Sequence, residues 1–192
     1  MRHNLSLKAD LRRGLIAAIL VVCIVSRPVS VFPQGREIKE VFSASTRSFE
    51  VGDSCFVPVE YYLSGGYPPT TTAACDSIYA FLKQNPTVSI AIIVHSDFRP
   101  IPMGNDVLTE MRANRLKQEI LTRGDIDSNR IVAIGMADNQ PRIVTKEMHK
   151  EYRFFPVGQV LDREFITTLK DTQMRETAHR FNRRTVAKII KK

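Results

Sequence analysis

The chain has 192 residues, of which 43% are hydrophobic and 25% are charged, and its formal net charge is +8. This length suits one well-buried domain and is too short for two of ordinary size. The composition excludes a largely disordered chain. The excess of positive charge suits an anionic polymer or a membrane surface, but it is equally common in proteins that bind neither.

The first 26 residues have the order of a secretory signal peptide. The basic stretch MRHNLSLKADLRR precedes the apolar run GLIAAILVVCIV, which is too short to span a bilayer comfortably. We therefore expect export, followed by a linker or leading strand at 27–47. A retained anchor and acylation at Cys23 are less favoured alternatives, since Val22 stands where lipoprotein cleavage needs a small residue.

Two further cysteines, Cys55 and Cys75, follow the signal segment. Export would place them in an oxidising compartment, where such a pair can form a disulfide. They could equally remain two separate buried thiols, because sequence carries no information on the distance between them.

From residue 48 onward, strand and helix signals alternate along the chain. Runs of β-branched and aromatic residues predict strands, and apolar residues three or four positions apart predict helices. The strands are expected within 48–63, at 87–95, at 129–136 and at 182–190, and the helices at 70–84 and 106–123. This order predicts an α/β layer with crossover helices on a sheet.

A long polar stretch at 141–181 separates the last two predicted strands. Within it, 161–169 and 171–181 are typical of short helices, each with an aspartate where a cap is needed. An excursion of this length is typical of a decorated loop or lid, and no chemical motif occurs in it.

One acidic and one basic residue stand at the centre of the chain. Asp97 follows the strand at 87–95, and ligands of an α/β sheet gather beyond the carboxyl ends of its strands. Arg112 lies in the next helix, at the edge of the face formed by Thr109, Ala113, Leu116 and Ile120. Long helical side chains lean toward the amino end, so Arg112 should reach the loop of Asp97. The pair either forms an internal salt bridge or receives a zwitterion.

These two residues belong to a series of short motifs in a fixed order. The series is His95-Ser96-Asp97, Asn105, Leu108-Thr109, Arg112-Ala113, the passage GDIDSNRIVAIGMADNQP and Asn182-Arg183-Arg184. It resembles the OmpA-like domain, the peptidoglycan-binding family that includes the peptidoglycan-associated lipoproteins. The resemblance covers 48–192. It implies a βαβαβ sandwich with a mixed sheet, helices packed on that sheet, and an insertion at about 141–181 before the last strand.

The resemblance also implies a function without catalysis. The family binds the diaminopimelate side chain of the peptidoglycan stem peptide, which would anchor the outer membrane or an envelope complex to the cell wall from the periplasm. Asp97 would hold the ammonium group of that side chain and Arg112 its carboxylate. The full set of implied site residues is Ser96, Asp97, Arg99, Asn105, Arg112 and Arg183. Ser96 and Asn105 would shape the loop, and Arg183 would close the pocket.

The chain departs from the family pattern at several positions. Tyr61-Tyr62 stands where the family commonly has Phe-Asp, and Pro100 replaces a glycine. Ala137 and Asp138 replace a Gly and a Glu. A second hypothesis therefore remains open, in which the chain is an envelope protein–protein interaction module that keeps the fold but has lost or weakened ligand binding.

Other classes of function are not supported. The sequence has no G-x-S-x-G elbow, phosphate-binding glycine loop or H-E-x-x-H motif. Its basic residues are dispersed, which together with the export signal argues against nucleic-acid binding. We expect no cofactor and no metal, because the histidines are scattered; His95 is expected to form a structural hydrogen bond. The four histidines are His3, His95, His149 and His179.

Overall fold

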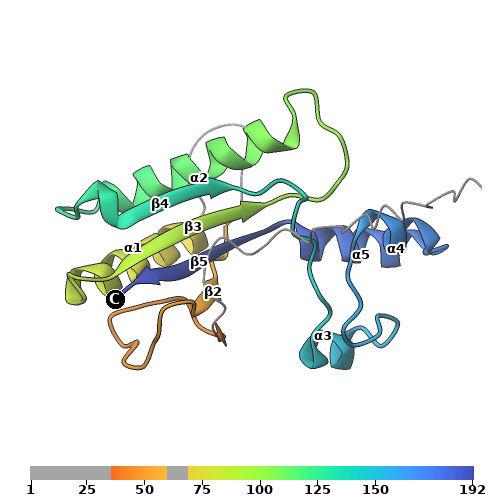
Figure 1. The fold of residues 1–192 in the computed structure, drawn as a ribbon, viewed down its shortest axis with the longest axis horizontal. Coiled ribbons are helices and arrows are strands. Elements are labelled where there is room, and N and C mark those ends of the chain that lie inside the picture. Colours follow the sequence, from red (N-terminus) through yellow and green to blue (C-terminus); the bar gives the residue numbers. More distant parts are fainter. Residues whose placement is uncertain (1–35, 60–68) are drawn as a thin grey trace, which may run out of the picture.

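The computed structural model describes residues 36–59 and 69–192 (Figure 1). Its strands are β1 (Glu37–Ile38), β2 (Ser54–Phe56), β3 (Ser89–His95), β4 (Ile131–Gly135) and β5 (Arg184–Lys191). Its helices are α1 (Pro69–Gln84), α2 (Asn105–Leu121), the 3-10 turn η1 (Ser128–Arg130), α3 (Lys146–Glu151), α4 (Arg163–Thr168) and α5 (Thr172–Asn182). The predicted signal segment, Cys23 and Tyr61-Tyr62 lie outside the described residues.

The strands form one mixed sheet in the order β1-β2-β5-β3-β4. β3 and β4 are parallel and are connected through α2, whereas β5 runs antiparallel to both β3 and β2. Helices pack on this sheet, so the predicted fold class is confirmed. The carboxyl ends of β2, β3 and β4 therefore lie at the same end of the sheet, where β5 begins.

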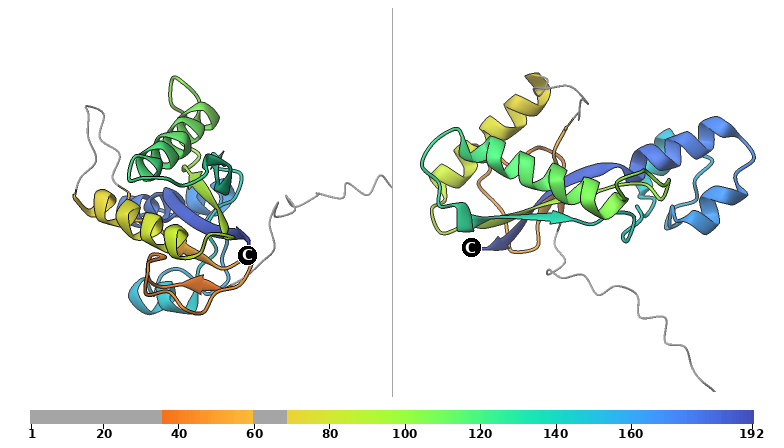
Figure 2. Two further views of the ribbon diagram at one scale, coloured as in Figure 1. Left: turned by 90° about the vertical axis from the view of Figure 1, so that its left-hand side faces the viewer. Right: turned by 90° about the horizontal axis from the view of Figure 1, so that it is seen from above.

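Both long helices cover the same face of the sheet (Figure 2). The apolar stripe predicted for α1 is buried, and so is the face predicted for α2; these residues are Ala74, Ile78, Phe81 and Leu82, and Thr109, Ala113, Leu116 and Ile120. Apart from Thr109 and Ala113, these residues share one core with Ile90 and Ile92 of β3 and with Ile189 of β5. The helix α2 approaches β4 closely at Gly135, where a Cβ atom would lie 2.4 Å from the backbone nitrogen of Glu110.

The segment before β2 belongs to the same core. The range 27–47, predicted as a linker or leading strand, contains β1, which pairs in parallel with β2. Phe42 is fully buried and stacks on Phe81, with ring centroids 5.1 Å apart. The start of the described chain is thus part of the packed domain rather than an unpacked connection.

The two cysteines of the described region are separate free thiols. Cys55 on β2 and Cys75 on α1 are both buried in the main core, and the backbone N–H of Phe42 donates to Cys55 Sγ at 3.4 Å. The structure therefore contradicts a Cys55–Cys75 disulfide and agrees with the alternative, two buried thiols. Burial raises the pKa of each thiol to about 11, because it disfavours the thiolate.

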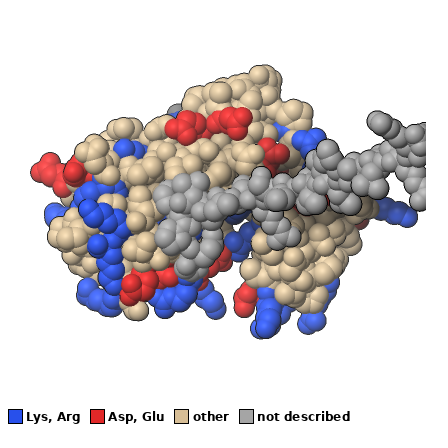
Figure 3. Space-filling view, viewed as in Figure 1, with Lys and Arg blue, Asp and Glu red and all other residues tan. Residues whose placement is uncertain are grey.

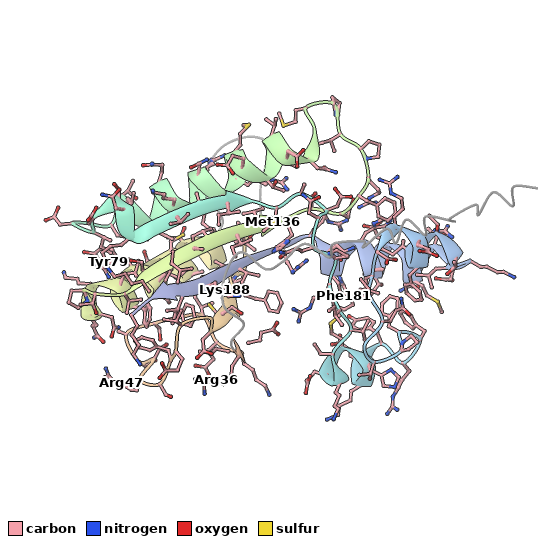
Figure 4. All side chains as sticks on the ribbon, viewed as in Figure 1. Arg36, Arg47, Tyr79, Met136, Phe181 and Lys188 are labelled. Atoms are coloured by element: carbon pink, nitrogen blue, oxygen red, sulfur yellow. The ribbon has the colours of Figure 1, made fainter. Side chains whose placement is uncertain are left out.

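The insertion is a folded helical unit and not an open loop. Its helices α3, α4 and α5 lie beyond the edge of the sheet at which β3 ends (Figure 1), and the surface is indented between them and the rest of the domain (Figure 3). A second core holds this unit together through Val144, Phe155, Leu161, Ile166 and Ala178. Phe181 of α5 points toward α3 (Figure 4), and its ring centroid lies 5.1 Å from that of Tyr152.

The ends of the insertion helices follow ordinary capping rules. Asp162 accepts a hydrogen bond from Phe165 N at the start of α4, and Asp171 accepts one from Met174 N at the start of α5. The two predicted helices are therefore confirmed together with their aspartate caps. The six-residue helix α3, capped by Thr145, was not predicted. Among the described residues, no helix is long and apolar enough to cross a membrane.

Candidate binding site

A cavity of about 420 Å³ opens at the carboxyl ends of β2 and β3. It is lined by Phe56, Val57, Pro58, Val59, His95, Arg112, Arg183, Arg184 and Thr185. Three of these side chains are guanidinium groups, and the described residues that line the cavity include no carboxylate. Because three like charges converge on this wall, the cavity favours an anionic guest.

Arg112 reaches this cavity from α2. The residue is partly buried, next to the fully buried Ala113, as its predicted place at the edge of the helix face requires. Arg183 reaches the same cavity from the junction of α5 and β5. Two guanidinium groups from different parts of the chain therefore share one opening.

Asp97 is not among the residues that line the cavity, and it is 5% exposed. Its Oδ2 atom accepts from Arg99 Nη2 at 2.7 Å and from Arg183 Nη1 at 2.6 Å, and its Oδ1 atom accepts from the backbone N–H of Arg99 at 3.0 Å. Burial alone would raise the pKa of Asp97, but the hydrogen bonds from Arg99 and Arg183 outweigh it and hold that pKa at about 2. The carboxylate is thus ionised and its oxygens are occupied by guanidinium groups of the same chain.

Glu176 of α5 completes a network of four charges. Its Oε2 atom lies 2.8 Å from Arg99 Nη1, and its Oε1 atom lies 3.0 Å from Arg183 Nη2. Each arginine is therefore shared between Asp97 and Glu176, with the two positive and two negative groups alternating. The side chain of Glu176 is 53% exposed, whereas that of Asp97 is 6% exposed, so the outer carboxylate is the one that solvent reaches.

Asn105 fixes the loop that carries Asp97. Its side-chain nitrogen donates to the backbone oxygens of Asp97 and Arg99, both at 3.1 Å. The cap position of α2 belongs to Gly104, without a side-chain hydrogen bond, and not to Asn105. The amide of Asn105 instead binds two backbone carbonyls in the loop segment before Pro100, as expected of a residue that shapes the loop.

The end of β4 supports the same loop from the other side. The backbone N–H of Ser96 donates to Ala137 O at 2.8 Å, and the N–H of Ala137 donates to Thr109 Oγ1 at 3.2 Å. Ala137 has a φ of 44°, a left-handed conformation that glycine adopts more easily. The departure from glycine at this position therefore leaves the turn in place at a local conformational cost.

Three buried side-chain atoms near this loop have no hydrogen-bond partner among the described residues. They are His95 Nδ1, Ser96 Oγ and His179 Nδ1. His95 was expected to form a structural hydrogen bond, but its Nδ1 atom forms none within the described part of the chain. His179 of α5 lies with Nδ1 3.8 Å from Asp97 Oδ2 and packs edge-on against Phe98. Unsatisfied buried polar atoms are rare, and their grouping marks this region as unusual.

The structure brings all six predicted site residues to one region, but not into one cavity. Arg112 and Arg183 line the cavity, while Asp97 and Arg99 form the network with Arg183. Sequence reasoning missed Glu176, His179 and Arg184. Glu176 precedes Arg183 by seven positions, two helical turns, which is the one signal that could have placed it near the site.

Comparisons with known proteins give a likeness in fold. No protein-family model and no curated protein sequence matched the chain. A crystal structure of a putative MotB-like protein from Desulfovibrio vulgaris aligns with 72% of this chain and 74% of its own, at 13% identity and a TM-score of 0.48. The OmpA-like domain of FopA1 from Francisella tularensis aligns with 84% of this chain and 96% of its own, at 16% identity and a TM-score of 0.40.

Proposed function

We propose that this chain binds peptidoglycan non-covalently through the diaminopimelate side chain of the stem peptide. In this role it anchors the outer membrane or an envelope complex to the cell wall. The observation that carries the proposal is the position of Arg183, which lines the cavity beside Arg112 and also binds Asp97. Groups that suit both ends of a zwitterion are therefore linked through one side chain.

The carboxylate end of the ligand is received in the cavity. Arg112 and Arg183 present two guanidinium groups to the same space, and a guanidinium binds a carboxylate through two parallel hydrogen bonds. Binding there places a negative charge where the described wall carries only positive ones. This half of the proposal needs no movement of the buried carboxylate.

The ammonium end requires an exchange at Asp97. The oxygens of Asp97 are occupied by Arg99 and Arg183, so the ammonium group must replace one of these guanidinium groups. Both arginines have substantially exposed side chains, 45% for Arg99 and 37% for Arg183, which leaves them free to turn toward solvent. When Arg183 is the group displaced, its guanidinium meets the carboxylate of the same ligand, so the charge released from Asp97 gains a new partner.

Cosedimentation with purified peptidoglycan tests this function. Sacculi that contain diaminopimelate should retain the protein, whereas sacculi that contain lysine at that position lack the side-chain carboxylate and should retain much less. Free diaminopimelate should compete, and Arg112→Gln should reduce retention. Equal retention on both kinds of sacculi would overturn the proposal.

A second candidate function is an envelope protein–protein interaction module. The observation in its favour is the complete occupation of Asp97 by arginines of the same chain, a state in which no ligand is needed to satisfy the buried charge. The same experiment separates the two candidates. A correctly folded protein that sediments with neither kind of sacculus supports the interaction module.

A further inference from the structure

The strand register brings two residues outside the zwitterion site to the wall of the same cavity. His95 at the end of β3 pairs with Arg184 at the start of β5. Directly opposed residues of an antiparallel pair project from the same face of a sheet, so the two side chains are neighbours. Both residues line the cavity that Arg112 and Arg183 also line.

The charge of Arg184 has no carboxylate partner among the described residues. Its Nη1 atom donates to Asn182 O at 3.2 Å and its Nη2 atom to Gln140 O at 2.9 Å, and both acceptors are neutral carbonyls. Glu37, the acid whose charge acts on Arg184, is itself bound by Arg142 at 2.7 Å. Burial, and then the neighbouring Arg142, lower the pKa of Arg184 to about 9, as expected of a cation short of counter-charge.

His95 contributes a neutral hydrogen-bonding group at the same point. His95 is 5% exposed, and its Nδ1 atom has no hydrogen-bond partner among the described residues. Burial, reinforced by the charges of Arg184 and Arg142, lowers the pKa of His95 to about 2. The imidazole is therefore uncharged at neutral pH, and it can donate one N–H without adding to the positive charge of the cavity.

An anion beside Arg184 would supply the counter-charge that Arg184 lacks and an acceptor for the imidazole of His95. The two carbonyl contacts use two of the five N–H donors of the guanidinium, which leaves donors for a further acceptor. A carboxylate has two oxygens, so one can accept from Arg184 and the other from His95. The cavity volume of about 420 Å³ leaves room for such a group in addition to one held by Arg112 and Arg183.

We propose that Arg184 and His95 form a second carboxylate subsite, which takes the carboxylate at the carboxyl end of the stem peptide. This inference rests on the proposed function and deepens it, because it gives the cavity binding groups for two carboxylates. It predicts a preference for a stem peptide that ends at a free carboxylate over one in which that group is blocked.

Calorimetric titration with a paired ligand tests the subsite. The probes are a diaminopimelate-containing stem tripeptide with a free carboxyl end and the same peptide amidated at that end only. Wild type should bind the free form about tenfold or more tightly, as expected for charge-assisted hydrogen bonds. Arg184→Gln and His95→Phe should bind both forms with similar affinity. Arg180→Gln, on α5 and outside this cavity, is the matched control and should keep the preference.

The possible failures are distinguishable. If wild type binds both peptides equally and Arg112→Gln abolishes binding, the subsite is wrong and the proposed function stands. If wild type binds neither peptide, the proposed function fails, and the subsite is then decided by titrating acetate while recording the imidazole nitrogen resonances of His95. A saturable shift in wild type that Arg184→Gln removes supports it, and the absence of that shift overturns it. If Arg184→Gln does not fold, Arg184→Lys, which keeps the charge, is used in its place.

Discussion

Arg183 Nη1 lies 2.6 Å from Asp97 Oδ2, although the two residues are 86 positions apart in the chain. This contact joins the loop after β3 to the point where the insertion ends and the last strand begins. Because the same arginine also lines the cavity, the insertion and the binding site are connected through one side chain. The proposed function therefore makes the affinity of the site depend on a competition between internal and external partners of Arg183.

Glu176 is the internal competitor that solvent reaches. It binds Arg99 and Arg183, one of which the proposed exchange must displace from Asp97. We expect Glu176→Gln to bind diaminopimelate-containing peptide about two- to tenfold more tightly, since exposed ion pairs contribute about 0.2–1 kcal/mol each. Calorimetric titration measures the change, and Glu164→Gln, an exposed position on α4, should leave affinity as it is. Weaker binding by Glu176→Gln would mean that Glu176 positions the arginines instead of competing for them.

The depressed pKa of Asp97 makes stability depend on pH. A carboxyl group whose pKa falls from 3.8 to about 2 on folding stabilises the native state above pH 4, and this contribution is lost as pH falls through that interval. The difference in unfolding free energy between wild type and Asp97→Asn should therefore shrink by roughly 2 kcal/mol between pH 6 and pH 2. Urea unfolding at several pH values measures it. Asp125→Asn, at an exposed position, serves as the control. A difference in unfolding free energy that does not change with pH would contradict a depressed pKa of Asp97 in the native protein.

The second core should be separable from the first. Phe155 is fully buried in the insertion, and replacing a buried phenylalanine by alanine costs about 3–5 kcal/mol. We expect Phe155→Ala to raise amide hydrogen exchange in α3, α4 and α5 while β3 and α2 remain protected. Phe154→Ala, at a residue that is 39% exposed, should change exchange much less. Uniform loss of protection would show that the two cores unfold as one unit.

The helices and strands of the main unit were predictable because their residues repeat with a fixed period. Phe81 and Leu82 continue the stripe of α1, and Leu116 and Ile120 that of α2, so periodicity alone identified the buried faces. The insertion core was not predictable in this way. Phe155 lies between helices, without a repeat that would mark it as buried.

The site was predictable only as far as its motifs extend. The motif series singled out Asp97, Arg112 and Arg183, and helix geometry predicted that Arg112 lies at the edge of the buried face of α2. The network with Glu176 depends on how α5 packs against the loop after β3, and no local pattern encodes that packing. The sequence therefore could not show whether Asp97 is bound by arginines of the same chain or is open to a ligand, because the same residues can form either arrangement.

The two buried thiols should be inert in the native protein. Burial raises the pKa of Cys55 and Cys75 to about 11, and only the thiolate reacts at an appreciable rate. In a Cys23→Ser background, a thiol reagent at pH 8 should label the native protein very slowly and should label two groups after denaturation without a reductant. Absence of labelling in the denatured, unreduced protein would show that the two cysteines pair after all.

The most direct test of the central claim is calorimetric titration of diaminopimelate-containing stem peptide into wild type, Asp97→Ala and Arg112→Ala. Loss of one partner of a charged contact should cost on the order of 2–5 kcal/mol, so each variant should bind at least about 30-fold more weakly than wild type. Arg115→Ala, at an exposed position on α2, should bind as wild type does. Equal affinity of wild type and both site variants for the peptide would contradict the account.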